Sequence, residues 1–269
     1  MRTLSLLGQS LIRHRSIWWQ FTLRYVEIRN KGSHLGLLWS VLNPLIMLAL
    51  YVLVFGYIYG GRFGVLPNET KAEYGLGIFL GLALYNFVSD LLCSSPVSIS
   101  DNTNFVKKVV FPLEVLPAAL VGSAFVHLLI TLGLVAIGVV FFGPGLSLSC
   151  LWLVVVLIPV IMWAMGIAWA VSALSVFLQD IRQLLPAMAT GLMFASAVFY
   201  PPSKIPAAVW TVLKYNPLIH AIEGARAVML WGQPLNWHAM LYLYGTGALA
   251  MLCGFWIFMK LKPAFADVL

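Results

Sequence analysis

The stretch from Gly32 to Gly61 contains no Asp, Glu, Lys or Arg. Because a helix needs ~20 mostly apolar residues to cross the hydrocarbon core of a bilayer, this stretch is long enough to cross with a tilt. A second charge-free stretch, Val115–Gln179, is too long for one crossing, and Gly143-Pro144-Gly145 divides it into a hairpin of two helices. The chain is 61% hydrophobic and only 9% charged, whereas a soluble domain is about 25% charged. We therefore predict an all-α integral membrane protein.

Hydropathy and charge predict six transmembrane helices in a single domain. Their approximate bounds are 35–59, 75–92, two segments within 115–179, 184–200 and 239–259. Asn43-Pro44 lies inside the first span, where proline removes a backbone hydrogen bond and bends the helix. Two short apolar helices, beginning near Pro206 and Leu218, follow the fifth span. They are too short to cross the bilayer twice and are expected on its outer side.

Residues 1–34 precede the first span and are predicted to form an amphipathic helix on the cytoplasmic side. The six-span region is predicted at 35–260, and a basic tail follows at 261–269. The helix lies either in the interface of an anionic leaflet or against the cytoplasmic face of the protein, and the two interpretations are compatible. Six spans put both termini on one side. Most of the 16 Lys and Arg residues also fall on that side, so both termini are predicted to be cytoplasmic.

The sequence lacks the motifs of several enzyme classes. It contains no G-x-x-x-x-G-K-[ST] phosphate-binding loop, no H-E-x-x-H zinc motif and no G-x-S-x-G nucleophile motif. Cys93, Cys150 and Cys253 have no metal or redox spacing and are predicted to be small buried residues. His127 lies alone in the third span and is interpreted as a packed, hydrogen-bonded histidine. Asp90 is either a functional intramembrane acid or a side chain that reaches interfacial water.

The loop after the second span, NTNFVKKVVFPLEVLP at 102–117, combines an apolar side with two lysines and ends at proline. A short amphipathic helix of this kind suits docking into a groove of a soluble partner. The alternative is a surface helix that only links two spans.

Several motifs occur in a fixed order along the chain: R-Y-x-x-x-R-x-K-G-S-x-L-G-L-L-W-S-V-L-N-P-L from Arg24, then N-F-V-K-K-V-V-F-P-L-E-V-L-P, Q-D-I-R-Q, Y-P-P and N-P-L. This order resembles the permease subunit of ABC-2 type polysaccharide exporters over essentially the whole chain. The O-antigen and teichoic acid branch is the most similar, and the capsule branch is the nearest alternative.

The resemblance implies a homodimer in the bacterial inner membrane with two separate ATPase subunits. Those subunits would bind ATP and Mg, and this chain would carry no cofactor. The polymer, linked to undecaprenyl diphosphate, would pass through a channel at the dimer interface. The resemblance also assigns contact with the ATPase to the N-terminal helix, the loop from residue 102 and the turn at residues 180–182. The coupling residues so implied are Asn104, Phe105, Lys107, Lys108, Phe111, Pro112, Glu114, Asp180 and Arg182.

Aromatic side chains are candidates for the lining of such a channel, because sugar faces stack on aromatic rings. Tyr51, Phe55 and Tyr59 follow at i, i+4 and i+8 on one helix face, and Phe194, Phe199 and Tyr200 come from the fifth span. The alternative is that these rings face lipid or form an interfacial belt.

Four arginines of the N-terminal helix are candidates for meeting a lipid diphosphate at the cytoplasmic gate, because guanidinium groups bind phosphate in bidentate fashion. They are Arg13, Arg15, Arg24 and Arg29.

Other classes of function are less well supported by the sequence. A membrane-embedded lipid-sugar transferase or acyltransferase would need clustered acids or histidines, whereas Glu27, Asp90, Glu114 and Asp180 are dispersed. An ion channel or small-molecule carrier would favour charged rings or broken helices near the midplane. A drug or haem exporter of the same type usually has a large outer loop after the first span, whereas residues 60–74 form a short one.

Overall fold

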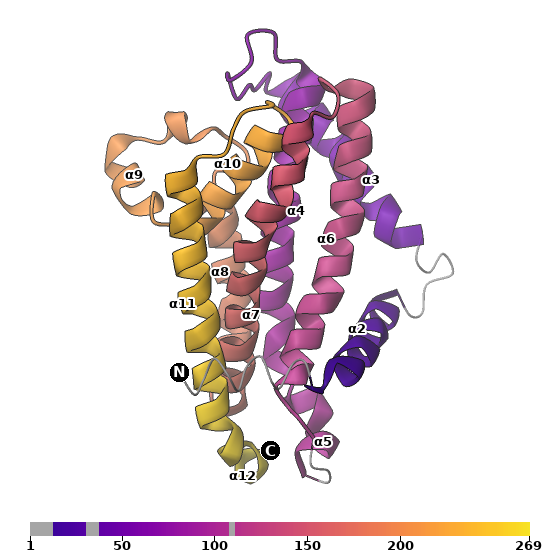
Figure 1. Cartoon of the computed structure of the whole chain (residues 1–269), viewed down its shortest axis with the longest axis vertical. Helices are drawn as coiled ribbons and strands as arrows, with labels where there is room; N and C mark the ends of the chain where they lie inside the picture. The colour runs from indigo at the N-terminus through magenta and orange to yellow at the C-terminus, as the bar shows by residue number, and fades with distance from the viewer. Residues whose placement is uncertain (1–12, 31–37, 108–110) are drawn as a thin grey trace.

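The computed structural model describes residues 13–30, 38–107 and 111–269, and this part of the chain is helical without strands (Figure 1). The helices are α2 (Arg15–Asn30), α3 (Trp39–Tyr51), the π-helix η2 (Val52–Ile58), α4 (Lys71–Ser94), α5 (Thr103–Lys107), α6 (Val115–Phe142), α7 (Leu153–Phe177), α8 (Ile181–Ala195), α9 (Ala207–Leu213), α10 (Pro217–Met229), α11 (Trp237–Leu261) and α12 (Phe265–Val268). Short 3₁₀ turns lie at Ser95–Val97, Ser100–Asn102, Leu148–Trp152, Pro202–Lys204 and Lys262–Ala264. The all-α prediction is confirmed.

Five helical segments in the described residues are long and apolar enough to cross a membrane. They are Trp39–Ile58, Lys71–Val97, Val115–Phe142, Leu148–Phe177 and Trp237–Val268. The chain is therefore a multi-pass membrane protein. The remaining predicted span corresponds to α8, whose 15 residues extend about 22 Å, short of the ~30 Å hydrocarbon core. A sixth crossing stays a prediction from the sequence.

Local sequence signals explain where the helices begin and end. At the start of α4, the hydroxyl of Thr70 accepts a hydrogen bond from the Glu73 N–H, and the Glu73 carboxylate accepts one from the Thr70 N–H. The side-chain oxygens of Asn216 and Asn236 cap α10 and α11 by accepting hydrogen bonds from backbone N–H groups in the first turn of each helix. The hairpin between α6 and α7 falls at the predicted glycines, where Gly145 has a φ of +88°. The two predicted short outer helices are α9 and α10.

Helix α4 lies at the centre of the molecule and is buried along most of its length, with α6, α7, α8 and α10 packed around it (Figure 1). The first span, α3 with η2, is by contrast hardly buried in the single chain and consists of exposed and half-buried residues. The prediction of buried cysteines is wrong for Cys93 and Cys253, which are exposed. The free cysteine side chain is small and apolar, so a cysteine on the surface of a membrane protein can contact lipid at no cost in free energy.

Helices α7 and α11 cross with their backbones in contact, and glycine makes this possible. A Cβ atom on Gly254 would lie 2.1 Å from the carbonyl oxygen of Gly166, and one on Gly166 would lie 2.2 Å from the carbonyl oxygen of Ala250. Helices in lipid are not held together by the hydrophobic effect. Small residues at such crossings let the backbones come close enough for extensive van der Waals contact, which holds the helices together instead.

We expect the Gly254→Ala substitution to lower stability by about 1–3 kcal/mol, because neither backbone can move aside without separating the two helices. Gly245→Ala is the matched control on the same helix, since no atom lies within 4 Å of its added Cβ. The measurement is the apparent thermal unfolding midpoint of the chain in lipid nanodiscs. Equal midpoints for the two variants would contradict the close crossing.

Candidate functional site

The N-terminal helix α2 packs on the N-terminal end of α6. The indole N–H of Trp18 donates to the carbonyl of Ala118 at 3.0 Å, and Thr22, only 1% exposed, lies over Gly122. A Cβ on Gly122 would lie 2.6 Å from the Thr22 hydroxyl, so glycine is needed for this approach. Of the two compatible interpretations, packing against the protein itself is confirmed for the described part of the helix.

An aromatic cluster, formed by Phe21, Phe105 and Phe111, joins α2 to the loop after α4. The ring centroids of Phe21 lie 5.6 Å from Phe105 and 5.5 Å from Phe111, and Phe105 and Phe111 are 4.8 Å apart. Edge and tilted contacts of this kind contribute about 0.5–1.5 kcal/mol each beyond burial. The structure therefore brings together the N-terminal helix and the predicted coupling loop.

Two further contacts hold the same loop in place. The Arg182 guanidinium, from the start of α8, donates through Nη2 to the Ser100 hydroxyl at 2.9 Å, which ties the α7–α8 turn to this loop. The Asn102 amide donates to the Tyr25 hydroxyl at 3.5 Å. Burial raises the pKa of Tyr25 above its ordinary value of 10.0, so the phenol stays protonated.

Glu114 faces the interior, unlike the other members of the predicted coupling set. Its side chain is 7% exposed, and its carboxylate accepts a hydrogen bond from the Lys262 ammonium at 2.6 Å. Its backbone carbonyl also accepts the indole N–H of Trp169 at 2.9 Å. These contacts tie the loop to α7 and to the C-terminal tail. Direct contact of Glu114 with another subunit stays a prediction.

The remaining predicted coupling residues differ in exposure. Asn104, Lys107 and Asp180 are exposed, and Pro112 is half-buried. Lys108 lies outside the described residues. Within α5, the exposed side chains of Asn104 and Lys107 are both polar. Among the described members of the predicted coupling set, the accessible ones are therefore Asn104, Lys107 and Asp180.

The four candidate arginines divide into two groups. Arg13, Arg15 and Arg24 are exposed, and the Arg24 guanidinium lies 5.7 Å from the centroid of the Phe21 ring. Arg29 instead forms an ion pair with Asp90 of α4. Both side chains of this pair are partly exposed. Asp90 therefore has a cationic partner that connects α2 to the central helix, and whether it is functional or only reaches interfacial water stays open.

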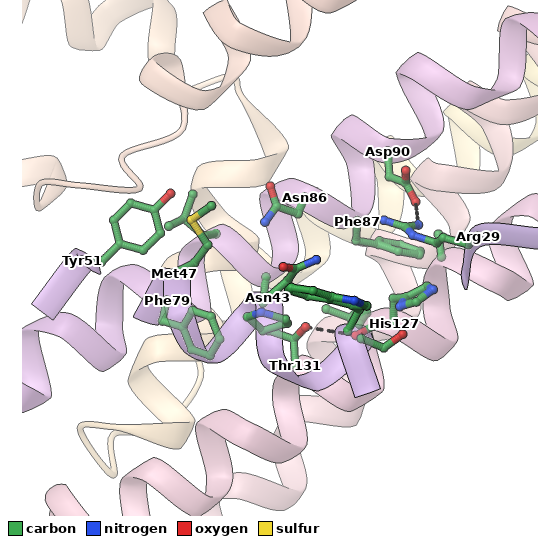
Figure 2. A pocket seen from close by; sticks show the side chains of 17 residues that line it. Arg29, Asn43, Met47, Tyr51, Phe79, Asn86, Phe87, Asp90, His127 and Thr131 are labelled. Carbon is green, nitrogen blue, oxygen red and sulfur yellow. Dashed lines mark hydrogen bonds and ion pairs between the residues drawn. The ribbon is translucent and has the colours of Figure 1, made fainter. Parts of the chain in front are cut away.

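A cavity of about 460 Å³ begins at this ion pair and continues between α3, α4 and α6 (Figure 2). Polar groups from all three helices line it, together with aromatic rings. Its principal polar members are Arg29, Asp90, Asn43, Asn86, His127 and Thr131. The prediction of a hydrogen-bonded His127 is contradicted at Nε2, which is buried without a hydrogen-bond partner among the described residues. The His127 side chain lines the cavity between α3, α4 and α6, and no described group there bonds to its Nε2 atom.

Five of the six predicted channel aromatics form one connected series of rings, which we call the aromatic series. The Phe55 ring stacks on Phe199 with centroids 4.9 Å apart, and it also contacts Tyr51 at 6.2 Å and Tyr59 at 5.8 Å. Phe194 contacts Phe199 at 6.3 Å. Of the same set, Tyr200 donates from its hydroxyl to the backbone carbonyl of Phe194. The structure therefore joins the first span to the end of α8 and the segment after it through these rings, and their role in lining a channel stays a prediction.

A fully buried arginine holds this second segment in position. Arg226 of α10 is 0% exposed and donates to the carbonyls of Gly77 and Ala197 at 3.0 Å each and to that of Val198 at 2.5 Å. It also forms an i,i+3 ion pair with Glu223 at 2.8 Å. The turn it binds immediately precedes Phe199 and Tyr200. The sequence places this arginine in the second of the two short outer helices but does not reveal its role, because its carbonyl partners are far away in sequence.

Most of these elements lie within a stretch of sequence that matches a known protein family. The family described as ABC-2 type transporter matches residues 17–230, from α2 to the end of α10. This chain belongs to the ABC-2 type transporter family. The resemblance found in the sequence motifs is therefore confirmed.

Curated relatives of this ABC-2 chain span nearly its whole length. The O-antigen export system permease protein RfbA of Klebsiella pneumoniae is 28% identical over 249 residues, covering 92% of this chain and 93% of the relative. The protein of the same name from Myxococcus xanthus is 23% identical over 263 residues, with 97% and 98% covered. The polysialic acid transport protein KpsM of Escherichia coli is 26% identical over 248 residues, with 86% and 93% covered.

Proposed function

We propose that this chain is the permease subunit of an ATP-driven exporter of polysaccharide linked to undecaprenyl diphosphate, with O-antigen as the substrate, in the bacterial inner membrane. The observation that carries the proposal is the aromatic series between the first span and the segment after α8. Family membership and relatives named for O-antigen export and polysialic acid transport support the same substrate class.

Aromatic rings suit the passage of a polymer of sugars. The apolar faces of sugar rings pack on aromatic rings, and each such contact is weak enough to exchange for the next as the chain moves. Tyr51 and Phe199 are half-buried, whereas Tyr59 is 75% exposed, so the exposure of the rings increases towards the outer end of the first span. This gradient supports a channel lining that opens outward.

Energy would come from a separate ATPase subunit, because the sequence contains no phosphate-binding loop. Asn104, Lys107 and Asp180 are the exposed residues proposed to contact it. The aromatic cluster of Phe21, Phe105 and Phe111 lies directly behind them and joins the loop to α2. We propose that the ATPase displaces this loop and that the aromatic cluster transmits the displacement to α2. The ion pair of Arg29 and Asp90 would then transmit it to the central helix α4.

A homodimer is the proposed assembly, and the first span is its proposed contact. Trp39–Ile58 is apolar but almost unburied in the single chain, so a second copy can cover part of it. The aromatic series lies on this span and would then face the space between two protomers. Both termini are proposed to be cytoplasmic, and so is the end of the bundle that carries α2, α5 and α12 (Figure 1).

The relative that transports polysialic acid supports capsule glycan as a second candidate within the same class. A lipid-sugar transferase is not favoured by the positions of the acids. Asp90 pairs with Arg29 and Glu114 with Lys262. The described residues contain no group of three or more His, Cys, Asp or Glu placed to hold a metal ion.

The test is ATP hydrolysis and glycan translocation in proteoliposomes, with the chain alone and with its cognate ATPase. We expect the chain alone to be inert and the complex to hydrolyse ATP and move the lipid-linked glycan to the opposite leaflet, where a glycosidase can digest it. The proposal fails if no ATPase copurifies with the chain, or if the chain alone modifies the lipid-linked sugar.

A further inference from the structure

The cavity between α3, α4 and α6 contains two amides that the helices do not use. Asn43 of α3 and Asn86 of α4 are both exposed in the single chain, and neither side-chain amide has a hydrogen-bond partner among the described residues. Asn86 is flanked on α4 by the buried rings of Tyr85 and Phe87. An unpaired amide facing hydrocarbon costs several kcal/mol. The two amides therefore require polar contents in the cavity.

Helix α6 supplies the third polar wall. The Thr131 hydroxyl donates to the His127 backbone carbonyl at 3.0 Å, so its oxygen can still accept a hydrogen bond. The Nε2 atom of His127 is buried without a partner among the described residues. Because an unsatisfied buried polar atom costs about 1–3 kcal/mol, a ligand that reaches this ring would gain most of that amount. Figure 2 shows the Asn43, Asn86, His127 and Thr131 side chains around one space.

The combination of neutral polar groups with aromatic rings matches the chemistry of a sugar. Amides and hydroxyls both donate and accept hydrogen bonds, as sugar hydroxyls do. Trp39, Phe79 and Phe87 line the same cavity and offer rings to the apolar face of a sugar. The volume, about 460 Å³, lies within the range of pockets that hold small organic ligands.

The two ends of the cavity differ in chemistry, and only one of them adjoins the aromatic series. The pair of Arg29 and Asp90 lies at one end and Tyr51 at the other (Figure 2). Arg29 is 45% exposed and Asp90 32% exposed, so the pair is accessible from the cytoplasmic interface. Tyr51 is the first ring of the aromatic series. A group entering past Arg29 is therefore led towards the proposed polymer path.

We propose that this cavity is an intramembrane binding site for the first sugar and the diphosphate of the lipid-linked polysaccharide. Arg29 leaves Asp90 to bind the diphosphate, and the amides of Asn43 and Asn86 hold the sugar. Guanidinium binds phosphate with the same bidentate geometry that it uses for carboxylate, so the exchange preserves its hydrogen bonds. This inference rests on the function proposed above.

The test uses the full complex of permease and ATPase in nanodiscs and three ligands: the native lipid-linked glycan, undecaprenyl diphosphate alone, and the glycan released from its lipid. Affinity is measured by thermophoresis for the wild type and for the double variant Asn43→Leu/Asn86→Leu. We expect that variant to lose at least about tenfold in affinity for the lipid-linked glycan, as removal of two hydrogen bonds of ordinary strength implies. Its affinity for undecaprenyl diphosphate alone should change less than about twofold, a shift of under ~0.5 kcal/mol.

Arg29→Gln provides the second arm, since it should weaken both lipid ligands by a similar factor. Thr246→Val is the control, because it removes a membrane hydroxyl that bonds only within α11. The cavity site is overturned if the asparagine variant binds the lipid-linked glycan as the wild type does, which would mean that the cavity holds only water. Failure of the wild-type complex to bind that glycan would instead contradict the proposed function. Tighter binding of the released glycan than of the lipid-linked form would assign the site to a free saccharide.

A labelling experiment keeps the proposal testable if affinity cannot be measured for the double variant. Asn86→Cys is introduced into a chain whose native cysteines are replaced by serine, and its alkylation by a membrane-permeant maleimide is followed. The lipid-linked glycan should slow this reaction several-fold, whereas undecaprenyl diphosphate should slow it less. An unchanged rate with bound glycan would contradict occupancy of the cavity.

Discussion

Replacing Arg226 with leucine is expected to destabilise the protein by about 3–5 kcal/mol, the typical loss when one partner of a buried charged network is removed. The guanidinium donates to three backbone carbonyls and to Glu223, and its carbon atom lies 4.2 Å from the centroid of the Phe63 ring. Leucine would leave the carbonyls of Ala197 and Val198 buried without these donors. The apparent unfolding midpoint in nanodiscs should fall by roughly 6–20 °C.

The same substitution is expected to reduce export, because the bound turn positions part of the aromatic series. The turn is strained, since Ala197 has a φ of +51°, a conformation that costs a non-glycine residue about 1–3 kcal/mol. Arg226 stabilises it, and the Tyr74 hydroxyl adds a hydrogen bond to the Phe199 carbonyl at 2.8 Å. Without the arginine, Phe199 should lose its fixed place against Phe55.

Two other variants separate charge from geometry. Arg226→Lys keeps the charge but cannot reach several carbonyls at once, so we expect an intermediate midpoint. Lys204→Met removes an exposed charge from the same outer segment and should leave the midpoint unchanged. If Arg226→Leu behaved like Lys204→Met, the buried network would not hold the turn.

Phe111→Ala is expected to uncouple ATP hydrolysis from export. The substitution removes the ring contacts of Phe111 with Phe21 and Phe105, each worth about 0.5–1.5 kcal/mol. A loss of this size between the ATPase contact and α2 corresponds to about 5–150-fold in coupling. We expect the complex to hydrolyse ATP at a rate within about twofold of wild type, equivalent to under ~0.5 kcal/mol, while export in proteoliposomes falls by at least fivefold.

Phe141→Ala is the matched control, because this ring is 74% exposed near the end of α6 opposite α2. It should change neither activity. Assembly of each variant with the ATPase is checked by size-exclusion chromatography, so that loss of the complex is not mistaken for uncoupling. Normal export by an assembled Phe111→Ala complex would contradict the role of the aromatic cluster.

The sequence by itself determined the class of the protein and the positions of most helices. Charge-free stretches such as Val115–Gln179 must be helical in lipid, since every backbone group needs an internal partner there. The break at residues 143–145 and the short outer helices follow from glycine and proline. The spacing of Tyr51, Phe55 and Tyr59 placed three rings on one face, and the order of the motifs indicated the family. All these signals are local or read directly along the chain.

Only the tertiary structure decided which distant groups meet. Phe199 stacks on Phe55, Arg226 reaches the carbonyl of Gly77, and Asn86 faces Asn43 across a cavity. His127, expected to be hydrogen-bonded, instead has a buried Nε2 without a partner among the described residues. Such contacts depend on the crossing angles and axial positions of whole helices, which are set by packing at close contacts such as that between α7 and α11. Hydropathy defines which segments enter the membrane, but it carries no information about which face of one helix meets which face of another.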